Sequence, residues 1–301
     1  MDSAAIAGLV ASPAGLAAVW DLAAPEPQTM PVVFASPHSG CDYPREFVAQ
    51  ARLDPITLRK SEDSFVDELF AGVTGEGAPL LKALFPRAYL DPNREPFELD
   101  PAMFADPLPA YANTRSPRVA GGLGTIARVV ANGEEIYRGK LRVSDALERV
   151  NCLYRPYHEA LRRLVAATMS RFGRVLLIDC HSMPSVGGPM DEDAGRRRFD
   201  IVLGDCHGTS CAPSVVTLVE RFLAGCGYQV VRNNPYAGGF TTRHYGIPAE
   251  RVHALQIEIN RAIYMNEAAI ERKPALARVA AHMTALAAHL RERLPSLRLG
   301  D

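Results

Sequence analysis

Short runs of consecutive apolar residues recur along the chain, and each gives way to polar turn residues. Such runs are typical of strands that are buried on both faces of a sheet. They lie at 31–35, 78–84, 88–90, 175–180, 200–204, 229–232 and 252–259. Apolar residues at helical spacing predict helices at 54–58, 61–73, 144–172, 214–224 and 273–293. Strands that alternate with helices predict the α/β class with a largely parallel or mixed sheet.

A long segment rich in Pro and Gly separates the first strands from the longest helical pattern. Residues 102–124 are predicted to be a loop, and loops of this length in compact domains are usually functional or disordered. Strand-like runs at 125–130 and 134–137 flank the dipeptide Asn132-Gly133. This arrangement predicts a hairpin near the functional site.

Two features of the second half interrupt regular structure. Pro156 is expected to kink or divide the helix at 144–172, because proline has no backbone N–H to donate. Residues 233–246 form a Gly-rich segment with a central Arg243, which we predict to be a loop.

The chain has 301 residues, 48% of them hydrophobic, which is enough for a sizeable core. We predict one domain over 1–301. Within it, 1–30 is an N-terminal lead-in that forms a short helix or a frayed leader. Residues 102–140 form a loop and hairpin insertion near the site, and 273–293 form a C-terminal helix.

The charge balance argues against several classes of partner. Lys and Arg total 33 and Asp and Glu total 34, so neither nucleic acid nor an anionic membrane is expected to bind. No run of about 18 apolar residues predicts a membrane span, and the first 20 residues lack the basic start of a secretory signal. Six cysteines without a C-x-x-C pair indicate a reducing cytoplasm. No pattern bears on the oligomeric state.

Two histidines follow predicted buried strands and precede turn residues. They are His38, in SPHSG, and His181, in DCHSMP. Glu62 and Asp63 stand at the start of the predicted helix at 61–73. Two imidazoles and one carboxylate with an open fourth position are a common catalytic zinc arrangement. The alternative is that each histidine is a hydrogen-bonded strand-end residue and that the acids cap the helix.

Other polar side chains lie where they can support such a site. Asp179 precedes His181 by two residues and can orient its imidazole. Glu258 lies within the apolar run LQIEI, where a carboxylate is costly to bury alone. It either pairs with an arginine such as Arg261 or faces a cleft as a general base. The candidate carboxylate-binding arginines lie in turn-rich segments: Arg87, Arg94 and Arg243.

Familiar catalytic motifs of other classes are absent from the sequence. It has no G-x-S-x-G elbow, no Walker-type phosphate loop and no G-x-G-x-x-G. His207, in DCHGTSC, is a further loop histidine, and the sequence supports its membership of the site less strongly than that of His38 and His181.

Several segments together resemble the N-formylglutamate amidohydrolase family. In chain order they are SPHSG, SEDSFVDELF, FPRAYLDPNREPFELD, GLGTIARVVANGEEIYRG, LLIDCHSMPS, DIVLGDCHGTSC, NNPYAGGFTTRHYG and ALQIEINRAIYMNE. The resemblance extends from about residue 31 to residue 267. It implies a three-layer α/β/α fold like that of zinc carboxypeptidase-like hydrolases.

The same resemblance implies roles for individual residues. The metal ligands would be His38, Asp63 and His181, with Glu62 as the fallback carboxylate, and Glu258 would be the general base. Asn93, Arg94 and Arg243 would hold the carboxylates of the substrate, and Arg94 would also stabilise the oxyanion.

We therefore expect a single metallohydrolase domain with one Zn²⁺ ion, although an imidazole–carboxylate site accepts other divalent metals. The resemblance implies cleavage of N-formyl-L-glutamate, a small acidic N-acyl amino acid, to formate and L-glutamate in histidine degradation. The alternatives are a zinc amidase for another N-acyl amino acid or a cell-wall peptide, and a non-catalytic protein that binds metal or carboxylate.

Overall fold

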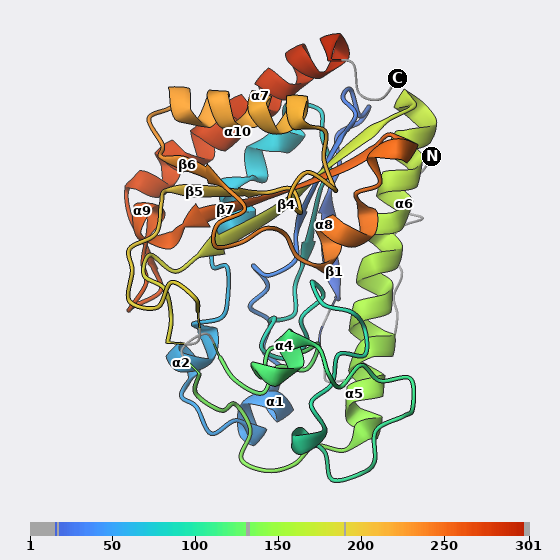
Figure 1. Cartoon of the computed structure of the whole chain (residues 1–301), viewed down its shortest axis with the longest axis vertical. Helices are drawn as coiled ribbons and strands as arrows, with labels where there is room; N and C mark the ends of the chain where they lie inside the picture. The colour runs from blue at the N-terminus through green and yellow to red at the C-terminus, as the bar shows by residue number, and fades with distance from the viewer. Residues whose placement is uncertain (1–15, 17, 131–132, 190, 298–301) are drawn as a thin grey trace.

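A computed structural model describes residues 16, 18–130, 133–189 and 191–297. The predicted N-terminal helix or leader lies mostly outside these residues, as does Asn132 of the predicted hairpin. In the described part a central sheet is covered by helices on both faces, giving a three-layer α/β/α arrangement (Figure 1). None of the described helices is long and apolar enough to cross a membrane.

The central sheet has the strand order β1-β3-β2-β4-β7-β5-β6. Its strands are β1 (Trp20–Ala23), β2 (Val32–Ser36), β3 (Leu80–Ala83), β4 (Val175–Met183), β5 (Ile201–Gly204), β6 (Val230–Arg232) and β7 (Val252–Asn260). Strands β3, β2, β4 and β7 are parallel neighbours. Strand β1 runs antiparallel to β3, and β5 runs antiparallel to β7 but parallel to β6. The sheet is therefore mixed, as predicted. A separate small sheet pairs β8 (Met265–Asn266) with β9 (Glu271–Arg272).

The helices connect these strands and cover the two faces. They are α1 (Arg45–Gln50), α2 (Pro55–Arg59), α3 (Val66–Leu69), α4 (Pro117–Ala120), α5 (Val143–Arg149), α6 (Arg155–Phe172), α7 (Pro213–Gly225), α8 (Phe240–Tyr245), α9 (Arg261–Tyr264) and α10 (Ala275–Arg293). Short 3₁₀ turns add η3 (Ala71–Thr74), η4 (Pro101–Met103), η6 (Pro248–Glu250) and η7 (Leu294–Ser296). One π-helical turn, η5 (Val150–Tyr154), lies between α5 and α6.

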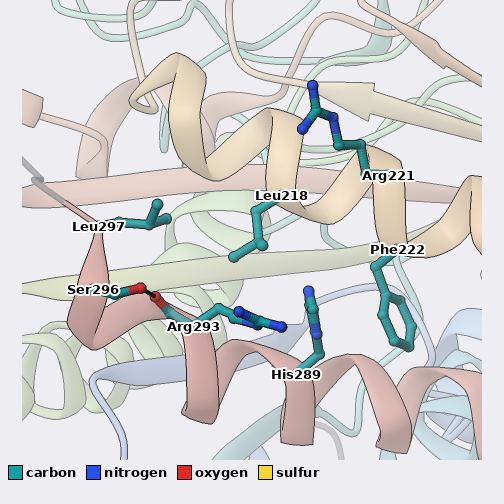
Figure 2. A pocket seen from close by; sticks show the side chains of 7 residues that line it. All are labelled: Leu218, Arg221, Phe222, His289, Arg293, Ser296 and Leu297. Atoms are coloured by element: carbon teal, nitrogen blue, oxygen red, sulfur yellow. Dashed lines mark hydrogen bonds between the residues drawn. The ribbon is translucent and has the colours of Figure 1, made fainter.

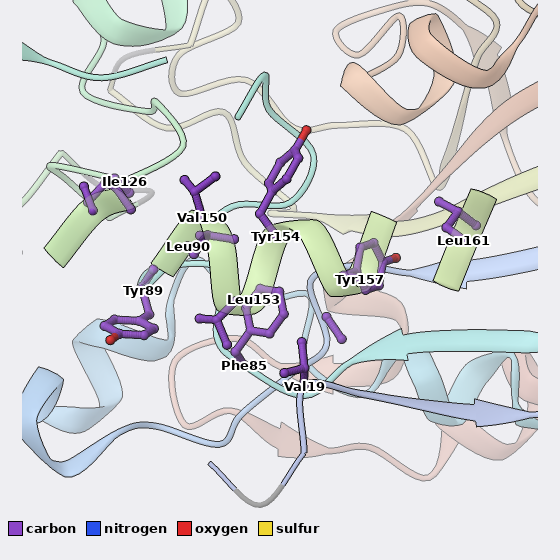
Figure 3. Close-up of a cluster of buried hydrophobic side chains, with 14 of the residues drawn as sticks. Val19, Phe85, Tyr89, Leu90, Ile126, Val150, Leu153, Tyr154, Tyr157 and Leu161 are labelled. Carbon is purple, nitrogen blue, oxygen red and sulfur yellow. The ribbon is translucent and has the colours of Figure 1, made fainter. Parts of the chain in front are cut away.

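Alternate side chains along the central strands belong to two separate hydrophobic clusters, one on each face of the sheet. On one face Leu177 and Ala254 pack with the apolar side of α6, including Tyr157 and Leu161 (Figure 3). On the other face the intervening strand residues pack against α3, α7 and α10. Full burial of one such aliphatic side chain stabilises the fold by roughly 1.5–3 kcal/mol, so both faces of the sheet contribute to stability.

Most predicted elements are confirmed to within a few residues, and the division near Pro156 is confirmed with a physical reason. Proline cannot donate a backbone hydrogen bond to the preceding turn. The π-helical turn η5 ends two residues before it, and α6 starts again at Arg155. The predicted helix at 144–172 is thus three consecutive segments.

Two predictions for the first half are wrong, and a third is confirmed only in part. The helix expected at 61–73 begins only at Val66, because Phe65 adopts a left-handed conformation (φ 68°), and Asp63 therefore lies in the turn before it. Residues 88–90 form a turn whose amides donate to the Pro86 carbonyl, not a strand. The predicted hairpin is present as a short pairing without extended strands. Val129 and Glu135 form an antiparallel bridge, and the amides of Ile136 and Val130 donate to the carbonyls of Arg128 (2.9 Å) and Glu134 (3.0 Å).

Two predictions for the second half also need correction. Strand β4 continues to Met183, so His181 lies within a strand instead of following one. The segment 233–246 contains helix α8, which carries Arg243. Its first turn forms because the amide of Thr241 donates to Asn93 Oδ1 (2.7 Å), an interaction between distant parts of the chain.

Candidate active site

The carboxyl ends of the parallel strands β2, β4 and β7 bring the polar side chains together. His181 pairs in register with Glu258 on β7, and Asp179 pairs with Gln256. Alternate strand residues share a face, so these four side chains project to the side of the sheet that carries α6 and α8. His38 follows the end of β2 by two residues. In open α/β sheets this edge is where ligands bind.

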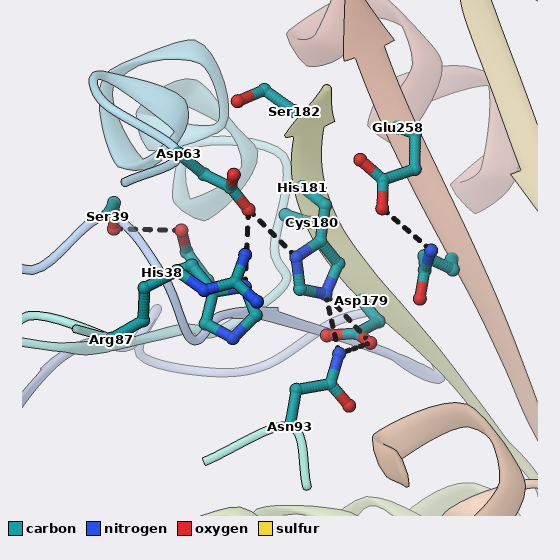
Figure 4. A network of polar contacts seen from close by, with 12 residues as sticks. His38, Ser39, Asp63, Arg87, Asn93, Asp179, Cys180, His181, Ser182 and Glu258 are labelled. Carbon is teal, nitrogen blue, oxygen red and sulfur yellow. Dashed lines mark hydrogen bonds and ion pairs between the residues drawn. The ribbon is translucent and has the colours of Figure 1, made fainter. Parts of the chain in front are cut away.

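His38, Asp63 and His181 form a compact and fully buried group (Figure 4). One ligand atom from each lies within 4.8 Å of the others. Oδ2 of Asp63 is 2.9 Å from Nδ1 of His181 and 3.4 Å from Nδ1 of His38. The backbone helps to hold this geometry, because the Asp63 amide donates to the His38 carbonyl (3.0 Å). Such a group can hold a metal ion.

A second carboxylate contacts the Nε2 atom of each imidazole, on the side of the ring opposite to Asp63. Nε2 of His38 lies 2.7 Å from Oδ1 of Asp91, and Nε2 of His181 lies 3.0 Å from Oδ2 of Asp179. Carboxylates in this position set the tautomer and the orientation of metal-binding histidines. Asp179 therefore stands where the sequence suggested, while Asp91 takes the corresponding place for His38.

Asn93 connects Asp179 and His181 to helix α8. Its Nδ2 donates to Asp179 Oδ2 (3.2 Å) and lies 3.1 Å from His181 Nε2, and its Oδ1 accepts from Thr241. A Cβ at Gly239 would lie 2.3 Å from Asn93 Nδ2, so only glycine lets the loop approach so closely. The amide of Asn93 is thus occupied by the protein and orients the residues behind the site.

Charges around the buried acids keep them ionised. Burial alone would raise the pKa of Asp63, but contacts with His181 and His38 outweigh it and hold the pKa well below its usual range. Burial likewise opposes ionisation of Asp91, and Arg87, Arg94 and His38 together keep its pKa well below normal. The site therefore presents two carboxylates ready to support bound cations.

Glu258 behaves differently. Its side chain is 7% exposed, and its Oε1 accepts a hydrogen bond from Gln256 (2.8 Å). Burial raises the pKa of Glu258 to about 7, although the positive charge of His181 lowers it. Arg261 was one possible ion-pair partner of Glu258, but its guanidinium instead donates to Asp63 Oδ1 (2.9 Å). A carboxylate with a pKa near neutrality can both accept and release a proton.

Glu62 points away from the two histidines. It accepts hydrogen bonds from Tyr43 (2.7 Å) and Ser64 (2.8 Å) and forms an ion pair with Arg59 (3.0 Å). These contacts occupy both of its oxygens. Of the two acids left open by the sequence, the structure brings Asp63 to the histidines.

The three predicted arginines differ in burial and in the groups that they contact. Arg87 donates to Asp91 Oδ2 (2.7 Å), and its charge also acts on Asp63 and Glu258. Arg94 is buried, and its Nε and Nη1 donate to the carbonyls of Leu123 and Asn93 (both 2.8 Å). Arg243 is exposed on α8, 3.4 Å from the Gly238 carbonyl.

Sequence reasoning missed three residues of this site: Asp91, Arg261 as the partner of Asp63, and Gln256. Gln256 and Glu258 alternate with apolar residues, just as Asp179 and His181 do, and this shared alternation was a usable signal. Asp91 carried no comparable signal, because it lies in an irregular turn of DPNREP.

Two other features lie apart from this group. His207 is exposed in the turn after β5, with a left-handed backbone (φ 55°). A cavity of about 440 Å³ opens between α7 and α10 on the opposite face of the sheet (Figure 2). It is lined by Leu218, Arg221, Phe222, His289, Arg293, Ser296 and Leu297, none of which was predicted for the site.

Comparisons with known proteins identify the family of this chain. A model of the N-formylglutamate amidohydrolase family matches residues 30–265. The N-formylglutamate deformylase of Pseudomonas putida is 30% identical over 248 residues, covering 79% of this chain and 83% of that protein. The crystal structure of N-formylglutamate amidohydrolase from Ralstonia eutropha JMP134 has a TM-score of 0.83 at 39% identity. That match covers 92% of this chain and 99% of that one. The gene product Atu2144 of Agrobacterium tumefaciens shares the fold, with a TM-score of 0.68 at 17% identity.

The fold, the buried polar site and these relatives define a hydrolase that acts on an amide bond. The chain belongs to the N-formylglutamate amidohydrolase family.

Proposed function

We propose that His38, Asp63 and His181 hold one Zn²⁺ ion. The observation that carries this proposal is Nδ1 of His38, a buried atom without a hydrogen-bond partner among the described residues. It faces Asp63 at 3.4 Å, within the group whose ligand atoms lie within 4.8 Å of one another. A buried polar atom without a partner is costly, and a cation at this point would satisfy it.

The supporting carboxylates agree with the same proposal. Asp91 and Asp179 occupy both Nε2 atoms, which leaves both Nδ1 atoms directed at Asp63. Imidazole and carboxylate donors suit zinc and several other divalent metals. When bound, zinc supplies Lewis-acid polarisation and lowers the pKa of a water molecule to about 7.

Within this frame Glu258 acts as the general base. Its carboxylate accepts a proton from the water that adds to the carbonyl carbon of the substrate. It then delivers that proton to the amide nitrogen as the C–N bond breaks. The pKa of about 7 suits both transfers at neutral pH. Formate and a free amino group are the products, and Glu258 returns to its ionised state.

We propose N-formyl-L-glutamate as the substrate. Relatives that share 30% and 29% of their residues with this chain are N-formylglutamate deformylases. Arg87 lies at the site with its charge directed at Asp91, and Arg94 retains Nη2, 3.5 Å from the same carboxylate. Both can attract a carboxylate of the substrate, and the oxyanion role of Arg94 stays a prediction. Asn93 is occupied by protein groups, so we assign it a positioning role. Binding of a substrate carboxylate by the exposed Arg243 stays a prediction.

The purified protein is expected to release formate from N-formyl-L-glutamate. Activity should disappear after dialysis against a chelator and return when one equivalent of Zn²⁺ is added. N-acetyl-L-glutamate and an N-acetylmuramoyl peptide serve as comparison substrates for the related amidase activities. Turnover that survives complete metal removal, or a preference for either comparison substrate, would contradict the proposal.

Asp91→Asn is expected to weaken zinc binding by about 10–100-fold, because an amide does not hold the imidazole of His38 as firmly as a carboxylate does. The zinc dissociation constant measured by competition with a chromophoric chelator checks this. Asp106→Asn, in the loop that follows η4, is the matched control and should leave zinc affinity unchanged, because the half-buried Asp106 accepts from the amide of Val143 and not from a histidine. Unaltered zinc affinity of Asp91→Asn would remove Asp91 from the site.

A further inference from the structure

The turn 91–94 carries two side chains that contact the imidazoles of the site. Oδ1 of Asp91 lies 2.7 Å from Nε2 of His38, and Nδ2 of Asn93 lies 3.1 Å from Nε2 of His181. The same Oδ1 accepts a hydrogen bond from the amide of Asn93 (2.8 Å), so the position of this carboxylate depends on the backbone of the turn. Because the turn belongs to no helix or strand, contacts from other segments have to hold its shape.

Two aromatic side chains, one helical turn apart, bind backbone carbonyls of this turn. The hydroxyl of Tyr154, at the end of η5, donates to the carbonyl of Arg94 (2.8 Å). Nε2 of His158, on α6, lies 2.8 Å from the carbonyl of Pro92. Residues four apart share one side of a helix, which lets both side chains reach the turn. Their ring centroids are 4.3 Å apart, so each ring limits the movement of the other.

The protonation of His158 follows from its two contacts. A carbonyl oxygen can only accept, so Nε2 carries the proton that is donated to Pro92. Burial lowers the pKa of His158 to about 4, so the ring is neutral near pH 7 and Nδ1 is an acceptor. The hydroxyl of Tyr245 lies 3.0 Å from this Nδ1 and 3.3 Å from the backbone carbonyl of His158. Tyr245 thus supports the tautomer that binds the turn.

These contacts close a ring of interactions through helix α8. Asn93 Oδ1 accepts from the amide of Thr241 in the first turn of α8. Tyr245, one helical turn later on α8, contacts His158, and His158 returns to the turn 91–94 through Pro92. The turn, α6 and α8 are therefore tied to one another, although they are far apart in the sequence.

We propose that His158, assisted by Tyr154, is a positioning residue that holds the turn 91–94 and so keeps Asp91 in contact with His38. This inference rests on the proposed function. Both ring nitrogens of His158 contact protein groups outside the metal site, so its effect on the metal passes through Asp91. Without the donor at His158 the turn loses one of the contacts that hold it, and the carboxylate supports His38 less firmly.

Two substitutions separate the hydrogen bond of His158 from the packing of its ring. His158→Phe keeps an aromatic ring beside Tyr154 but removes the donor, whereas His158→Gln keeps a donor at a similar reach and removes the ring. We expect His158→Phe to weaken zinc binding about tenfold, measured by competition with a chromophoric chelator, and His158→Gln to recover most of that affinity. If only ring packing mattered, the order of the two variants would be reversed, and that result would overturn the proposal.

Tyr154→Phe removes the second contact and is expected to weaken zinc binding by about 2–10-fold. Tyr157→Phe is its matched control on the same helix (Figure 3), because the buried hydroxyl of Tyr157 has no hydrogen-bond partner among the described residues. His282→Phe is the control for His158→Phe, because Nδ1 of His282, on α10, also contacts a tyrosine hydroxyl, that of Tyr228 (2.9 Å). Both controls should bind zinc as the wild type does.

A proton resonance provides a readout that needs neither metal nor turnover. In the zinc-free protein the Nε2–H proton of His38, hydrogen-bonded to Asp91, is expected to give a downfield NMR signal that Asp91→Asn removes. The signal should shift or broaden in His158→Phe and keep its position in His158→Gln. Circular dichroism and Tm show whether each variant is folded.

The two readouts distinguish failure of this inference from failure of the proposed function. If the wild type bound no zinc, the proposed function would fail, and the signal of His38 would still decide whether His158 positions Asp91. An unchanged signal in His158→Phe, or unchanged zinc affinity of this variant when the wild type binds zinc, would overturn the proposal.

Discussion

His181→Ala is expected to abolish turnover and to lower the zinc content of the purified protein well below one equivalent. The substitution removes the Nδ1 atom that faces Asp63 at 2.9 Å and leaves Asp179 without the imidazole it supports. Loss of metal catalysis costs several kcal/mol of transition-state stabilisation, so the rate should fall by at least about 10³-fold. Formate release and elemental analysis measure the two effects.

His289→Ala is the matched control for this variant. His289 lies beside the cavity between α7 and α10, on the opposite face of the sheet, where it stacks on Phe222. Zinc content and turnover should match those of the wild type. If His181→Ala kept full zinc occupancy and wild-type turnover, the metal centre would have to be placed elsewhere.

Glu258→Gln is expected to retain zinc and to lower kcat by about 10²–10⁴-fold, the usual contribution of a general base. Glutamine keeps the size of the side chain and a hydrogen bond with Gln256, but it cannot accept a proton. Metal content and kcat are measured on the same preparation. Near-wild-type kcat would reject Glu258 as the base.

The pH dependence gives an independent check on Glu258. The carboxylate must be ionised to act as a base, and burial raises its pKa to about 7. A bound cation would lower this value, so the acid limb of kcat/KM should lie at or below pH 7 and fall tenfold per pH unit beneath it. The limb should be missing in Glu258→Gln. Glu271→Gln, exposed on β9, should keep both the rate and the limb.

The type of chemistry was readable from the sequence because residue types carry it. The imidazoles of His38 and His181 and an acid at 62 or 63 already suggested a metal site. The structure then brings Asp63, not Glu62, to both imidazoles, because Glu62 is held by Arg59, Tyr43 and Ser64. Two neighbouring acids look equivalent in a sequence, and the turn before α3 directs them to different partners.

Predictions from local sequence patterns were wrong where contacts between distant parts of the chain outweighed the local preference for helix or loop. The helix α8 begins where Asn93, from a different part of the chain, accepts a hydrogen bond from Thr241. The helix expected at 61–73 is shortened by the left-handed Phe65, which turns Asp63 towards the backbone of His38. Neither interaction leaves a periodic trace in the sequence, because each depends on residues that meet only after folding.

The sequence by itself determined the strands, the main helices and the inventory of ionisable groups, since burial on both faces of a sheet demands long apolar runs. Only the tertiary structure decided which charges meet. Asp91 supports His38, and Arg261 pairs with Asp63. The reason is physical: electrostatic and hydrogen-bond energies depend on distances of a few ångströms between side chains, and irregular turns set those distances without any repeating pattern.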